Sequence, residues 1–129
     1  MYKELVIIII VIVLVIAGNI ITQSNTNKTV EVMSEELNSF RNEILEESIN
    51  KQKVEGHISN INDAWDEKSE ILAYYIEHDE LEKVTTELTK LKANVETEEY
   101  DFAIENLDNC VFILEHIRDK SALKIVNIF

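Results

Sequence analysis

The stretch that decides the fold is LEKVTTELTKLKANV, residues 81–95. Its apolar side chains recur at intervals of three and four residues, at Leu81, Val84, Leu88, Leu91 and Val95. This spacing places them on one face of an α-helix, whereas a half-buried strand would alternate every second residue. The stretch therefore predicts an amphipathic helix that buries its apolar face against other helices.

The same spacing recurs in three other segments of the chain. The apolar positions of these segments are Val30, Met33, Leu37, Phe40 and Ile44 in the predicted first helix; Val54, Ile58, Ile61, Trp65, Leu72 and Tyr75 in the second; and Ala103, Leu107, Cys110, Leu114 and Ile117 in the fourth. We expect the first helix to end near Ser48 and the second to begin near Asn50. Two Gly and no Pro leave little material for the turns of a β-fold. The predicted fold class is all-α.

Two helix starts carry residues that favour N-terminal caps. Asp79 followed by Glu82 has the pattern of a capping box, which would open the third helix. Thr97 is the expected cap of the fourth helix, and the acidic residues after it would complement the helix dipole.

An uncharged apolar run, LVIIIIVIVLVIAGNII, occupies residues 5–21. Its length of about 25 Å as a helix approaches the roughly 30 Å of a hydrocarbon core. Fourteen Ile, Leu and Val outweigh the single Asn19 in the free energy of insertion. We interpret residues 1–21 as a membrane anchor, residues 22–29 as a polar linker or a solvated continuation of the anchor helix, and residues 30–129 as an extracytoplasmic bundle.

A cleaved signal peptide is the competing interpretation of this segment. Val15-Ile16-Ala17 fits the small-residue rule for a cut before Gly18. The apolar run resumes at Ile20-Ile21, which favours an uncleaved anchor. Lys3 and the terminal amine favour a cytoplasmic N-terminus. We therefore expect a single-pass protein of the cell membrane with its bundle outside.

Short connections predict that the four helices pack antiparallel, up-down-up-down. The second and fourth helices then end on the membrane-proximal side, together with the apolar tail SALKIVNIF, residues 121–129. The tail is expected to pack into the bundle or to contact the membrane or a partner. The predicted architecture is an N-terminal transmembrane helix, an antiparallel four-helix bundle and a short apolar C-terminal tail.

Two stretches of the chain, together with the N-terminal anchor, resemble a bacterial family of unknown function. These are AWDEKSEILAYYIEHDELEKV, residues 64–84, and EHIRDKSALKIVNIF, residues 115–129. The shared features are a Trp in the second helix, an Ile-x-His-x-Glu-Leu stretch, a His-Ile pair before the tail and the closing Asn-Ile-Phe. They resemble the domain of unknown function family 4363 of clostridia and their relatives. Members often open the second helix with an acidic-Trp pair, which NKQKVEGH at residues 50–57 lacks. The resemblance supports the architecture and implies no activity.

Residues that could carry chemistry are few. Of the three histidines, His57, His78 and His116, we expect His78 to end the second helix and His116 to lie near the end of the fourth. They could bind a metal with Glu77, Glu80 or Asp119, or form a pH-sensitive pair, but terminal carbonyl capping is the favoured interpretation. Trp65 is expected in the core. The candidate structural or interaction residues are Trp65, His78, Glu80, His116, Asn127, Ile128 and Phe129.

The formal net charge of −13 would repel phosphate backbones and anionic surfaces, so we expect no nucleic-acid binding. One cysteine excludes an internal disulfide framework. No nucleophile-base pair, phosphate loop or metal-ligand spacing occurs, and we expect neither enzymatic activity nor a cofactor. The leading hypothesis is an accessory subunit, anchored in the lipid bilayer through residues 5–21, that docks on an integral membrane protein. The alternative is a secreted or anchored ligand-sensing helical bundle after signal-peptide cleavage.

Overall fold

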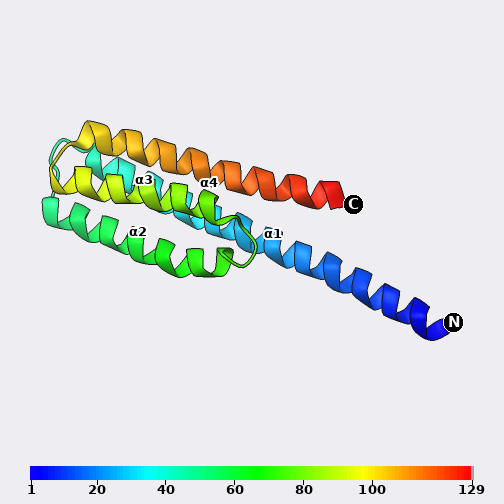
Figure 1. The fold of residues 1–129 in the computed structure, drawn as a ribbon. Helices are drawn as coiled ribbons and strands as arrows, with labels where there is room; N and C mark the ends of the chain where they lie inside the picture. Colours follow the sequence, from blue (N-terminus) through cyan, green and yellow to red (C-terminus); the bar gives the residue numbers. More distant parts are fainter. Residues whose placement is uncertain (129) are drawn as a thin grey trace.

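A computed structural model describes the backbone of residues 1–128 and the side chains of residues 1–123. Its four helices are α1 (Tyr2–Ile44), α2 (Lys51–Leu72), α3 (His78–Glu96) and α4 (Tyr100–Ile128) (Figure 1). The helical periodicity of the sequence is thus expressed as four α-helices joined by connections of three to six residues.

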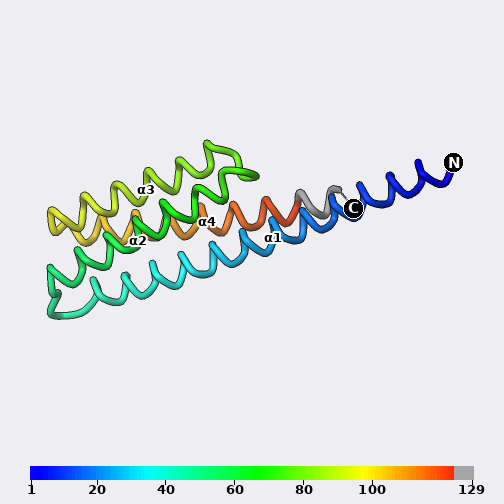
Figure 2. Tube along the Cα trace, turned by 90° about the horizontal axis from the view of Figure 1, so that it is seen from below, coloured from blue at the N-terminus to red at the C-terminus, as the bar shows by residue number. Residues whose placement is uncertain are grey.

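The helices form the predicted up-down-up-down antiparallel bundle. Each packs against its neighbour in the sequence, and α4 closes the bundle against α1. Within the described part of the chain, the diagonal pairs α1–α3 and α2–α4 make no close backbone contact. Figure 2 shows the same arrangement from below, with α1 continuing past the other helices toward the N-terminus.

The hydrophobic core lies between the four helices and follows the predicted stripes. Every stripe position is buried except Tyr75, which is only partly buried and whose hydroxyl has no hydrogen-bond partner among the described residues. Trp65 is the largest fully buried side chain, as expected. A single period of three and four residues therefore organises all four helices.

The segment of residues 22–29 is helical and joins the apolar run to the bundle without a break. Thr26 and Thr29 are buried, and the Thr26 hydroxyl donates to the carbonyl of Thr22 at 2.8 Å. Satisfying its hydroxyl within the helix lets Thr26 enter a packed interface at little cost. The segment is therefore a helical continuation with one covered face.

The apolar part of α1 projects beyond the bundle (Figure 1). All residues from Leu5 to Val15 are exposed, and the most apolar window of the helix is entirely uncovered by the rest of the chain. This is the one helix in the described chain that is long and apolar enough to cross a membrane, and a signal sequence would share that property.

The predicted helix ends needed correction. Helix α1 ends at Ile44 rather than near Ser48, whereas α2 does start after Asn50, whose side chain accepts from the amide of Lys53 at 3.2 Å. Helix α2 stops at Leu72 because the next five residues form a turn. The fourth helix extends well past Ile117, and the backbone of the expected tail belongs to α4 as far as Ile128.

Both predicted N-terminal caps were wrong. Helix α3 starts one residue before Asp79, and its N-cap, Glu77, makes no side-chain capping bond. Thr97 ends α3 rather than opening α4, and its hydroxyl bonds back to the carbonyls of α3. Glu98 follows with φ of 58°, the left-handed conformation that normally selects glycine.

Candidate functional site

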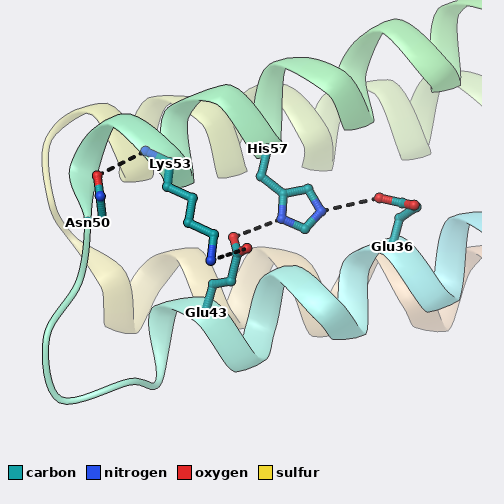
Figure 3. A network of polar contacts seen from close by, with 5 residues as sticks. All are labelled: Glu36, Glu43, Asn50, Lys53 and His57. Carbon is teal, nitrogen blue, oxygen red and sulfur yellow. Dashed lines mark hydrogen bonds and ion pairs between the residues drawn. The ribbon is translucent and has the colours of Figure 1, made fainter.

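A polar cluster joins α1 to α2 around His57 (Figure 3). Its Nδ1 lies 2.8 Å from Glu43 Oε2, and its Nε2 lies 3.2 Å from Glu36 Oε2. Lys53 Nζ lies 3.8 Å from the other oxygen of Glu43. The imidazole also stands edge-on to Phe40, with the ring centroids 5.4 Å apart. One side chain of α2 thus bridges two carboxylates of α1 at the margin of the core.

The local sequence explains this placement. Glu36 and Glu43 are seven residues apart, so they lie two turns apart on the same edge of α1 with Phe40 between them. His57 directly precedes the buried Ile58 and therefore lies beside the apolar stripe of α2. This cluster was not predicted, because the sequence shows the heptad spacing of Glu36 and Glu43 and the position of His57 beside a stripe but not the register that brings them together.

A second cluster joins α3 to α4. Lys120 Nζ lies 2.7 Å from Glu80 Oε1 and 3.6 Å from Glu77 Oε2. The hydrogen bond to Glu80 raises the pKa of the Lys120 ammonium above the ordinary lysine value, and the charges of both glutamates act in the same direction. Glu80 is only 9% exposed, so it depends on Lys120 for compensation of its charge.

The candidate residues from the sequence are not gathered in one place. Trp65 is buried and its indole N–H donates to the Thr85 hydroxyl at 2.9 Å. His78 starts α3 and contacts Glu82 of its own helix at 3.1 Å, while His116 is exposed in the middle of α4. Neither histidine caps the carbonyl end of a helix, so that interpretation was wrong. The side chains of Asn127 and Ile128 and the whole of Phe129 lie outside the described part of the structure.

One surface hollow brings two of these candidates together. It lies between the start of α3 and the second half of α4 and has a volume of about 290 Å³. Its lining residues are Glu80, Lys83, Phe112, Ile113, His116 and Ile117. Since Glu80 already pairs with Lys120, the hollow offers a mainly apolar wall with Lys83 and His116 at its edge.

One further reactive group is the buried thiol of Cys110. Burial raises the pKa of the Cys110 thiol to about 12, with a smaller contribution from the charge of Glu87. A thiol in that state is a small buried hydrophobe and a poor nucleophile. Among the side chains that the structure describes, no three His, Cys, Asp or Glu residues converge as metal ligands do.

Residues 20–128 match the model of the domain of unknown function DUF4363. The chain belongs to this family. No curated protein and no solved structure matches it. The DUF4363 match covers the whole bundle and the last residues of the apolar run, so the shared unit includes the junction at which α1 enters the bundle.

Proposed function

We propose that this DUF4363 protein is a non-enzymatic, single-pass membrane protein whose bundle is an accessory subunit of a membrane complex. Residues 5–21 cross the bilayer, the N-terminus lies in the cytoplasm and the bundle lies outside. The observation that carries the proposal is the uncovered apolar half of α1, which continues into the packed half without a break. In water that half would expose a long apolar surface, whereas lipid would cover it.

The spacing along α1 supports a bundle held close to the membrane surface. Arg41 of α1 pairs with Asp108 of the antiparallel α4. Lys28 lies thirteen residues before Arg41 in α1, and Ser121 lies thirteen residues after Asp108 in α4. Lys28 is seven residues from Ile21, or about 10 Å along a helix. The end of the bundle would thus lie near the headgroup layer, where an integral membrane protein could contact it.

Photo-crosslinking in intact membranes tests the docking role. A crosslinking residue at Leu123, exposed near the proposed membrane side of α4, is compared with one at Phe102, which is similarly exposed about 30 Å farther along the same helix. We expect an adduct with an integral membrane protein from the Leu123 position and not from Phe102. Recovery of monomer alone, or equal adducts from both positions, would contradict membrane-proximal docking.

The ligand-sensing alternative also has one observation in its favour. A cut before Gly18 would remove residues 1–17, of which all but the half-covered Ile16 are exposed. The core would therefore survive cleavage, and a secreted bundle with the hollow between α3 and α4 would remain. The first residue of the mature chain separates this alternative from the anchored subunit.

A further inference from the structure

We propose that His57 is a proton-dependent latch between α1 and α2. The inference rests on its two ring nitrogens, each of which faces a different carboxylate of α1. It does not depend on whether the bundle docks on a partner.

The chemistry of imidazole makes this arrangement dependent on protonation. A carboxylate only accepts hydrogen bonds, so each ring nitrogen must donate to hold its glutamate. The protonated ring carries two N–H donors and can hold Glu36 and Glu43 together. The neutral ring carries one, and its other nitrogen then presents a lone pair to a carboxylate. Loss of the proton therefore breaks one of the two links that His57 makes between the helices.

The surroundings indicate which link breaks. The side chain of Glu43 is 17% exposed, is closer to the ring and also meets Lys53, whereas that of Glu36 is 49% exposed. Water can solvate Glu36 more readily than Glu43. We therefore assign Glu36 as the released partner and Glu43 as the retained one.

Charged groups from α1 and α2 lie around His57. From α1 it faces Glu36 and Glu43, and on α2 Lys53 shares Glu43. Helix α3, the other neighbour of α2, contributes no charged contact to His57 among the described residues. Histidine side chains ordinarily change charge between pH 5 and 8, where carboxylates and lysines do not.

The latch would act on the way α2 is held in the bundle. Helix α2 lies between the two longest connections, residues 45–50 and 73–77. Three polar contacts link α2 to α1 in the described chain, namely His57 with Glu36, His57 with Glu43 and Lys53 with Glu43. A fall in the surrounding pH would tighten this pairing, and a rise would loosen it.

Melting of the full chain in detergent micelles at pH 5.5 and pH 8.0 tests the latch. Because only the doubly protonated ring can donate to both glutamates, one contact between α1 and α2 is lost as pH rises, and the melting temperature should fall. We expect the drop in melting temperature between the two pH values to be larger for wild type than for His57→Gln by about 3–6 °C. Glu36→Gln should also flatten the dependence, because an amide can donate to the neutral ring or accept from it.

His78→Gln is the matched control, because His78 is exposed and contacts only Glu82 of its own helix. It should retain the pH dependence of wild type. The latch is refuted if wild type and Glu36→Gln lose the same number of degrees, or if His78→Gln removes as much of the dependence as His57→Gln. If His57→Gln does not fold, Glu36→Gln gives the same comparison through a half-exposed side chain.

Discussion

Two charges placed in the apolar half of α1 should release the protein from the membrane without unfolding the bundle. The variant is Ile10→Asp with Ile12→Asp. Both side chains are 52% exposed and lie in the projecting part of the helix. The substitutions therefore remove no contact from the packed core.

The free energy of membrane insertion follows from the composition of residues 5–21. Fourteen Ile, Leu and Val at about −0.3 to −0.6 kcal/mol each favour insertion by roughly 4–8 kcal/mol. Replacing one central Ile by Asp costs about 3–4 kcal/mol, so the two replacements cost roughly 6–8 kcal/mol. The cost matches the whole gain, and the charged helix should no longer insert.

The assay separates insertion from folding. In cell fractionation with an alkaline carbonate wash, wild type should stay with the membranes and the double variant should move to the soluble fraction. Ile10→Leu with Ile12→Leu is the control and should stay membrane-bound. The bundle of the Asp variant should melt within about 2 °C of wild type. Retention of the Asp variant in the washed membranes, or melting many degrees below wild type, would contradict insertion through these residues.

Three further predictions concern the bundle. Glu98→Gly should raise the melting temperature by a few degrees, because glycine adopts φ of 58° without the strain of an L side chain. The exposed Lys51–Glu98 ion pair that is lost contributes little to stability. Glu98→Gln, which retains the strain, should not raise the melting temperature. Cys110 should resist alkylation at pH 8 in the folded chain and react in denaturant, whereas rapid native labelling would contradict its burial. Lys120→Met should destabilise the bundle at pH 9 by leaving Glu80 unpaired. Because the pKa of Lys120 is raised in the folded state, the difference in stability between wild type and Lys120→Met should shrink as pH rises through that elevated pKa. A difference in stability that grew with pH would contradict the pairing.

The core was predictable because it depends on one local rule. Burial of one helix face forces a three-and-four spacing, and the stripe of α3 from Leu81 to Val95 is buried as the sequence indicates. The helix ends were less predictable, because residue preferences compete there with packing. The Glu98 conformation ends α3 where no glycine marks the place, and Thr97 closes one helix instead of opening the next.

The polar clusters were largely unpredictable from the sequence because the residues that form each cluster come from separate helices. Glu80 was a candidate, but its partner Lys120 is forty residues away and is placed by the packing of α4 on α3. The contacts of His57 similarly require the register of α1 against α2. Periodicity shows which face of a helix is buried but does not fix the register between helices. The contacts of side chains at the margins of the stripes therefore cannot be predicted without the structure.

The mass of the intact chain extracted from its native membranes shows whether α1 is one uncleaved helix that anchors the bundle. We expect a mature chain that retains the whole of residues 5–21 and resists removal by the carbonate wash. A mature chain that begins at Gly18 and is recovered in the soluble fraction would contradict this expectation.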